Sequence, residues 1–75
     1  MSTYRVSSRS LTAVAYDPCG LLLRVQFRNG ACYEYTGVPV NLFAALLTAE
    51  SKGTYFNHFV RGKFRYLKLA TCLVI

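Results

Sequence analysis

The sequence is poor in the residues from which most active sites are built. Of its 75 residues, three are Asp or Glu, one is His and none is Trp. The single histidine, His58, has no Cys or Ser at the spacing of a catalytic motif, and the three acidic residues are scattered. We therefore expect a protein that is not an enzyme, with no cofactor and no small-molecule substrate. A weaker alternative, a small toxin-like nuclease, would need His58 for activity.

Cysteines are also few. Cys19, Cys32 and Cys72 form no C-x-x-C pair, and one histidine cannot complete a zinc site, so we expect no metal. Three scattered cysteines favour buried or inert thiols in a reducing compartment. Residues 1–5 lack the apolar segment of a secretory signal, and no apolar run could span a bilayer. The expected location is the cytoplasm, away from membranes.

The chain has length for one domain, residues 1–75, yet 53% of its residues are hydrophobic. A chain this short buries only about 60% of the surface that its unfolded form exposes. Either the core is unusually aromatic, or part of the apolar surface is covered by a second copy, and we expect a homodimer.

Acidic residues are outnumbered by nine Lys and Arg, which gives a formal net charge of +6. Such a field attracts polyanions, although charge also keeps a small apolar domain in solution. The basic residues fall mainly in two stretches, and we interpret them as candidate phosphate contacts in a nucleic-acid-binding protein. The primary candidates are Arg24, Arg28, Arg61, Lys63, Arg65 and Lys68, and the secondary ones are Arg9 and Lys52.

Three segments, residues 11–16, 21–28 and 31–36, have the composition or the alternation of β-strands. Tight turns between them predict an antiparallel meander of three strands. The second turn, at Asn29-Gly30, can close in two ways, as a two-residue loop that sets Val25 opposite Glu34, or as a three-residue loop that sets Val25 opposite Tyr33. A slip of one residue moves every side chain to the other face. The three-residue loop, with Gly30 left-handed and Arg24 opposite Glu34, gathers the apolar residues on one face and is preferred.

After residue 36, the spacing of the apolar residues changes to one that is typical of helices. Apolar residues recur at three- and four-residue spacing from about Pro39 to Ser51, and Gly53 is expected to end this helix in a left-handed conformation. A second, shorter helix is expected between Thr54 and Gly62. The fold class is then α+β, a three-stranded meander packed against a main helix and a short one. The expected core is Leu23, Val25, Phe27, Tyr33, Tyr35, Leu42, Phe43, Leu46 and Leu47.

Both ends of the chain lie outside this meander. Residues 1–10 are polar and are expected to be loose at least through Thr3. Residues 63–69 alternate basic and apolar side chains, which is typical of an edge strand. The uncharged residues 70–75 are expected to form core, a dimer interface or a partner site.

In order and spacing, several short motifs resemble the KTSC domain, which occurs at the C-terminus of some lysyl-tRNA synthetases and alone in small bacterial proteins. The resemblance covers about residues 6–66 and leaves an apolar extension at 67–75. It implies a small stand-alone domain for which nucleic-acid binding is the usual suggestion, and it carries over no aminoacylation activity. The motifs are Ser7-Ser8, Tyr16-Asp17, Leu23-x-Val25-x-Phe27-x-x-Gly30, Tyr33-x-Tyr35, Val38-Pro39, Ser51-x-Gly53-x-Tyr55-Phe56-Asn57 and Val60-Arg61.

The function predicted from the sequence is therefore non-catalytic binding of DNA or RNA, in a regulatory homodimer. Tyr33 and Tyr35 could stack on bases if they were exposed, but the preferred register places them in the core. The alternative is a protein-interaction module that uses an exposed strand edge or the tail.

Overall fold

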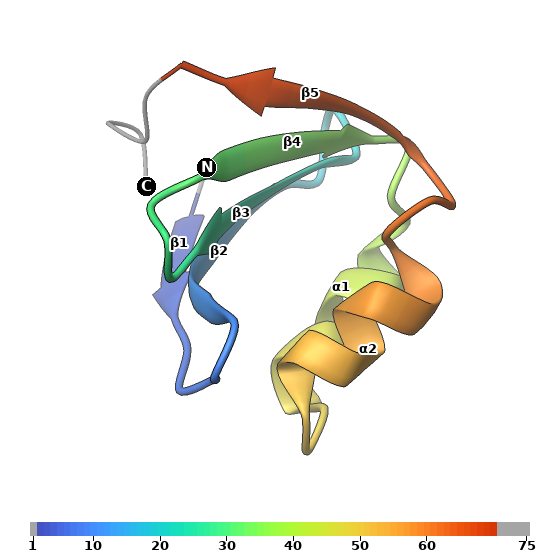
Figure 1. The fold of residues 1–75 in the computed structure, drawn as a ribbon. Coiled ribbons are helices and arrows are strands. Elements are labelled where there is room, and N and C mark those ends of the chain that lie inside the picture. Colours follow the sequence, from blue (N-terminus) through green and yellow to red (C-terminus); the bar gives the residue numbers. More distant parts are fainter. Residues whose placement is uncertain (1, 71–75) are drawn as a thin grey trace.

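The computed structural model describes residues 2–70, and side chains from Thr3 onward. Five antiparallel strands form one sheet in the order β1-β2-β3-β4-β5, and two helices lie against one face of it (Figure 1). The α+β class is confirmed, although the sheet has five strands instead of the three of the predicted meander. The elements are β1 (Ser2–Arg5), β2 (Leu11–Asp17), β3 (Leu22–Phe27), β4 (Cys32–Thr36), α1 (Val40–Thr48), α2 (Lys52–Phe59) and β5 (Arg65–Leu69).

The two additional strands flank the meander. The expectation of a loose N-terminus through Thr3 is wrong for Ser2 and Thr3, because both belong to β1, which pairs with β2. Its polar sequence gives little strand signal, and its pairing depends on the free edge of β2, a long-range partner. The edge strand expected at 63–69 is confirmed in β5, which pairs with β4.

The hairpin between β3 and β4 has the three-residue closure. Gly30 has a φ of +92°, a left-handed conformation that glycine adopts without steric cost. The Phe27 N–H donates to the Ala31 carbonyl at 2.9 Å. Val25 lies opposite Tyr33, as predicted, so the apolar side chains of both strands face the helices.

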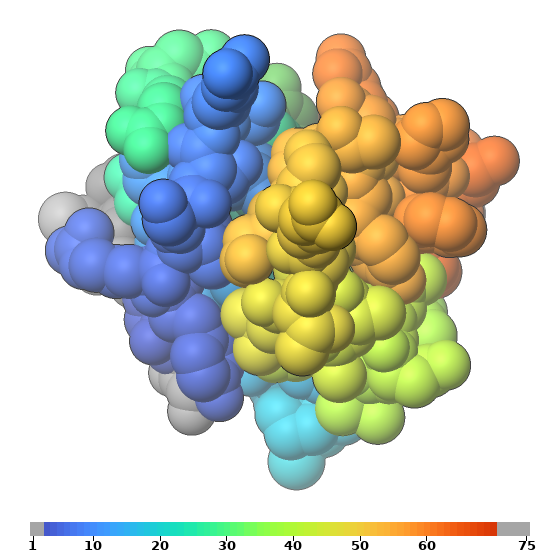
Figure 2. All heavy atoms as spheres, turned by 90° about the horizontal axis from the view of Figure 1, so that it is seen from below, coloured from blue at the N-terminus to red at the C-terminus, as the bar shows by residue number. Residues whose placement is uncertain are grey.

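The helix boundaries differ from the prediction. α1 ends at Thr48, and the Thr54 N–H donates to the Ser51 hydroxyl oxygen at 3.4 Å, which caps α2. Gly53 therefore lies inside α2, and its predicted role as a left-handed cap is wrong. A Cβ at Gly53 would stand 3.0 Å from the Ser10 Oγ, so glycine lets α2 approach the β1–β2 loop. These two segments lie side by side in Figure 2, the loop in blue and the start of α2 in yellow-orange.

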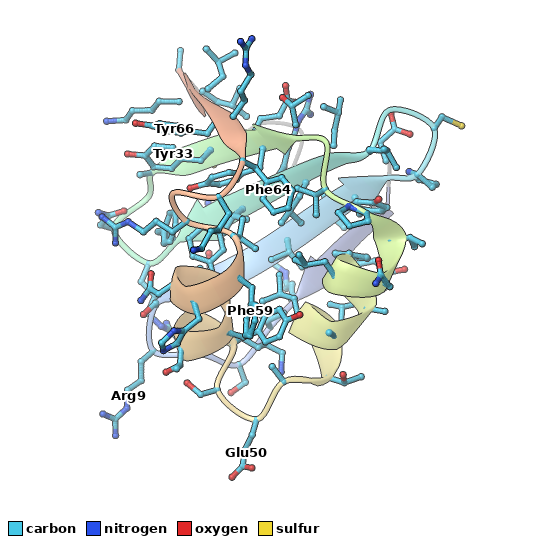
Figure 3. All side chains as sticks on the ribbon, turned by 90° about the vertical axis from the view of Figure 1, so that its right-hand side faces the viewer. Arg9, Tyr33, Glu50, Phe59, Phe64 and Tyr66 are labelled. Carbon is cyan, nitrogen blue, oxygen red and sulfur yellow. The ribbon has the colours of Figure 1, made fainter. Side chains whose placement is uncertain are left out.

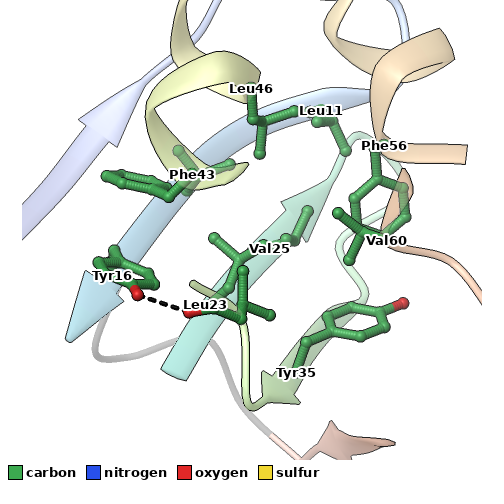
Figure 4. Close-up of a cluster of buried hydrophobic side chains, with 11 residues drawn as sticks. Leu11, Tyr16, Leu23, Val25, Tyr35, Phe43, Leu46, Phe56 and Val60 are labelled. Atoms are coloured by element: carbon green, nitrogen blue, oxygen red, sulfur yellow. Dashed lines mark hydrogen bonds between the residues drawn. The ribbon is translucent and has the colours of Figure 1, made fainter. Parts of the chain in front are cut away.

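The core lies between the sheet and both helices (Figure 4). All nine predicted core residues are buried or packed against the buried cluster. Within the core, the Tyr16 hydroxyl donates to the Val38 carbonyl, drawn as a dashed line. Burial raises the pKa of the Tyr16 phenol, and the neighbouring Asp17 raises it further. The members of the buried cluster that the expected core omitted are Leu11, Val14, Tyr16, Val38, Phe56 and Val60.

Two of the three cysteines lie within the described part of the chain. Cys19 is exposed with a free thiol, whereas Cys32 is buried and disulfide-bonded, so the expectation of inert thiols is wrong at Cys32. Cys72 and the predicted roles of the tail from residue 71 onward lie outside the described residues. Neither of the helices found between residues 2 and 70 is long and apolar enough to cross a membrane.

Candidate nucleic-acid interface

The helices leave the β5 side of the sheet partly uncovered. Phe56 of α2 packs against Phe27 and Tyr35, each at a ring-centroid distance of 5.4 Å. On β5, Tyr66 lies opposite Tyr35 and Lys68 lies opposite Tyr33. These two residues of β5 are therefore on the side of the sheet that faces the helices. Tyr66 is 62% exposed there, although its strand neighbour Tyr35 is buried.

A cavity of about 420 Å³ lies in this partly uncovered region, between β4 and β5 on one side and α2 on the other. In Figure 3, Tyr33 and Tyr66 point the same way, toward the side of the molecule from which Arg9 also projects. The cavity therefore opens toward the side of the molecule that carries Arg9. Its lining consists of Phe27, Asn29, Ala31, Tyr33, Tyr35, Phe56, Arg61, Gly62 and Tyr66.

Aromatic rings form one continuous wall of this cavity. The ring centroid of Tyr66 lies 5.7 Å from that of Tyr33 and 5.8 Å from that of Tyr35. The Tyr33 ring in turn contacts Phe27 edge-on at 5.6 Å. All of these spacings are within the range of about 4.5–7 Å that favours aromatic pairs. The wall is apolar, yet the ring of Tyr66 still presents surface to solvent.

Arg61 supplies positive charge to the cavity. The N–H groups of Val60 and Arg61 both donate to the Phe56 carbonyl, at 2.9 and 3.0 Å, which ends α2. Gly62, at a φ of +76°, then turns the chain toward β5. Arg61 is thereby exposed and lines the cavity near Tyr35. Burial raises the pKa of the Tyr35 phenol, with smaller contributions from Tyr33 and Tyr66, and the guanidinium of Arg61 opposes this shift.

A second basic group lies beside the hairpin. The Arg28 Nε donates to the Ser8 carbonyl at 2.7 Å, which fixes the arginine against the β1–β2 loop. Arg28, Arg9 and Ser8 line a shallow hollow there, next to Asn29, which lines the aromatic cavity. Lys68 is close as well, because it pairs with Tyr33 across the sheet.

The other predicted basic residues lie elsewhere. Arg24 is held on the outer face of the sheet by Glu34, with Nε 2.7 Å from Oε1. Arg65 shares that face, opposite Thr36 at the far end of β5 from Lys68. The Lys52 ammonium donates to the Ala49 carbonyl at 3.2 Å and lines a polar groove that also contains Arg9 and Glu50. Lys63 is exposed in the loop that follows Gly62.

The structure therefore brings together four of the eight predicted residues, Arg9, Arg28, Arg61 and Lys68. The sequence interpretation missed Asn29 and Tyr66 as site residues. The alternation of residues 63–69 carried the signal for Tyr66, because it places Tyr66 and Lys68 on one face. The placement of Tyr35 in the core is correct, whereas Tyr33 is only half-buried at the cavity.

Within residues 2–70, no cluster of three or more His, Cys, Asp or Glu side chains could hold a metal ion. His58 is exposed near the end of α2, where its ring lies 6.3 Å from that of Phe59.

Known proteins similar to this chain include small proteins of similar length and a short segment of a much longer enzyme. The sequence profile of the KTSC domain matches residues 7–64. A protein from Tsukamurella paurometabola, named only "Protein", is 41% identical over 64 residues, which cover 85% of this chain and 96% of that one. A lysine–tRNA ligase from Nostoc is 38% identical over 60 residues, or 80% of this chain but 11% of the ligase. The crystal structure of a KTSC domain protein from Yersinia pestis has a TM-score of 0.86 at 36% identity, covering 91% of this chain and 96% of its own.

Proposed function

Because the chain belongs to the KTSC domain family and resembles a short segment of a lysine–tRNA ligase, we propose that it binds nucleic acid without catalysing a reaction. The binding is mainly to phosphates and requires no base-specific contact. The proposed face consists of Arg28, Arg61 and Lys68 around the aromatic cavity, with Arg9 at its border.

The observation that carries this proposal is that Arg28, Arg61 and Lys68 lack acidic partners within the described chain. Glu34 is paired with Arg24 on the other face of the sheet. Asp17 accepts a hydrogen bond from the Cys19 N–H in the β2–β3 turn. Glu50 shares a groove with Arg9 and Lys52, so these two residues contribute less than the others. The positive field around the cavity is therefore available to an external anion.

A polyanion suits this face better than a single small anion. Exposed Arg and Lys side chains gain affinity when they displace the counterions condensed on a phosphate backbone. Arg61 and Arg28 present planar guanidinium groups, which can contact a phosphate with two parallel hydrogen bonds. We therefore propose an extended strand of phosphates as the ligand.

Arg61→Ala tests this proposal, with Arg65→Ala as its matched control. Both substitutions remove one exposed arginine, but Arg65 lies on the outer face of the sheet. Arg61→Ala should weaken binding and reduce the slope of log K against log salt by about 0.7–0.9, the value of one phosphate contact. Fluorescence anisotropy at several salt concentrations measures both quantities. Equal effects of the two substitutions would contradict the assigned face.

A second candidate function, a protein-interaction module, is favoured by the exposure of β5. This strand forms one edge of the sheet, and Leu67 is 62% exposed on it. An edge strand with an exposed apolar side chain can pair with a partner strand, including that of a second copy. We propose this edge as the contact of a homodimer. Sedimentation velocity should show a dimer that Leu67→Lys converts to a monomer, and a monomeric wild type would reject the contact.

A further inference from the structure

The cavity is lined by aromatic rings that phosphate binding alone would not need. Its wall of five rings, Phe27, Tyr33, Tyr35, Phe56 and Tyr66, lies directly beside the cation Arg61. An apolar wall next to a positive charge matches a ligand that is both flat and anionic. We infer that the cavity receives one unpaired base of a single-stranded segment, while Arg61 contacts the adjoining phosphate. This inference rests on the proposed function and adds which form of nucleic acid is bound.

The ring spacings indicate how the base would be held. Two rings with a base between them would not contact each other, whereas rings in direct contact have centroids about 4.5–7 Å apart. Tyr66 lies only 5.7 Å from Tyr33 and 5.8 Å from Tyr35, so no base fits between these rings. The base instead stacks on the exposed surface of Tyr66, which is 62% accessible. Tyr33 and Tyr35 support the Tyr66 ring from behind.

Asn29, which also lines the cavity, can contact the edge of the base. The side-chain oxygen of Asn29 accepts a hydrogen bond from the Ala31 N–H at 3.0 Å, which fixes its carboxamide in the turn. The amide N–H groups of Asn29 can then donate to a carbonyl or ring nitrogen of a base. The cavity volume of about 420 Å³ lies in the range of about 300–1,000 Å³ found for small-ligand sites.

A duplex cannot use this site in the same way. The faces of paired bases are stacked on their neighbours, and extruding one costs a few kcal/mol. A single strand already offers base faces to aromatic side chains. The cavity therefore predicts a preference for single-stranded DNA or RNA over duplex.

Tyr66→Ala is the direct test. Phe59→Ala is the matched control, because Phe59 is 52% exposed on α2 and does not line the cavity. Anisotropy titrations would use a short single-stranded oligonucleotide, the corresponding duplex and a free mononucleotide. Tyr66→Ala should weaken single-strand binding by roughly tenfold and leave duplex binding within about twofold. Tyr66→Phe should keep most of the affinity, and thermal melting would verify that each variant is folded.

The outcomes separate this inference from the proposed function. If Arg61→Ala weakens binding but Tyr66→Ala and Phe59→Ala have equal effects, the base site is wrong and phosphate binding stands. The same conclusion follows if the wild type binds duplex as tightly as single strand. A mononucleotide that binds as tightly as the oligonucleotide would replace the strand with a free nucleotide as ligand. Absence of binding to every probe at low salt would overturn both proposals.

Discussion

Two aromatic clusters lie on the same face of the sheet, one closed and one open. Under α1, the rings of Tyr16 and Phe43 stack at 4.6 Å with an interplanar angle of 10°, and both are buried. Beside α2, Tyr33 and Tyr66 contact each other at a tilt of 55° along a cavity. The same residue types thus stabilise the fold in one place and offer ring surface in the other.

The difference follows from how much of the sheet two helices can cover. A helix is about 10 Å wide and strands are spaced about 4.8 Å apart, so two helices cover about four strands. The fifth strand, β5, extends beyond this cover. Because β5 carries Tyr66 and Lys68 on its helix-facing side, the uncovered region is both aromatic and basic.

The largest expected contrast is in stability. Phe43→Ala should lower the free energy of unfolding by about 3–5 kcal/mol, because it leaves a cavity in the closed cluster. Tyr66→Ala should change it by less than about 0.5 kcal/mol, as expected for an exposed side chain. Urea denaturation of both variants measures the two values. Equal losses would show that the open cluster is also structural, and Phe43→Leu should recover most of the stability.

A smaller contrast concerns the tyrosine hydroxyls. Tyr16→Phe leaves the buried Val38 carbonyl without its donor and should cost about 1–3 kcal/mol. Tyr33→Phe removes a hydroxyl that points away from the ribbon in Figure 3, and should cost less than about 0.5 kcal/mol. Thermal melting compares the two variants. A larger loss for Tyr33→Phe would mean that the cavity hydroxyl has a structural role.

The smallest expected effect is on the pKa values of the buried tyrosines. The pKa values of Tyr16 and Tyr35 are both raised, chiefly by burial. The unfolded state therefore loses these protons first, from pH about 10, and stability that is complete below that pH falls as the pH rises through the folded values. Arg61 opposes the shift only at Tyr35. Arg61→Ala should raise the pKa of Tyr35 and leave that of Tyr16 unchanged in an NMR titration of the phenol carbons.

The meander could be predicted from the sequence because its signals are local. Alternating residues in β3 and the Asn29-Gly30 turn specified the register, and the Arg24–Glu34 pair followed from it. β1 could not be predicted, because a strand of four residues depends on a partner that begins at residue 11. The predicted cap at Gly53 failed for a similar reason. Glycine is required there by the approach of Ser10, which lies 43 positions earlier in the chain.

The positions of the basic residues on the surface could also be predicted only in part from the sequence. Arg61 and Arg65 belong to one basic stretch, yet they lie on different sides of the sheet because strand alternation and the Gly62 reversal separate them. Pairing with Glu34 removes Arg24 from the candidate face. The cavity requires strands β3 to β5, the hairpin and the end of α2 together, so no single stretch of sequence contains it.

Local patterning was thus enough to define the fold class, the central hairpin and the excess of positive charge, since each depends on neighbouring residues. Which cations share a surface, and which tyrosines stay accessible, were settled only when the helices packed on the sheet. Helix coverage is a long-range property, because it depends on the widths of packed layers and not on the preferences of the residues within them.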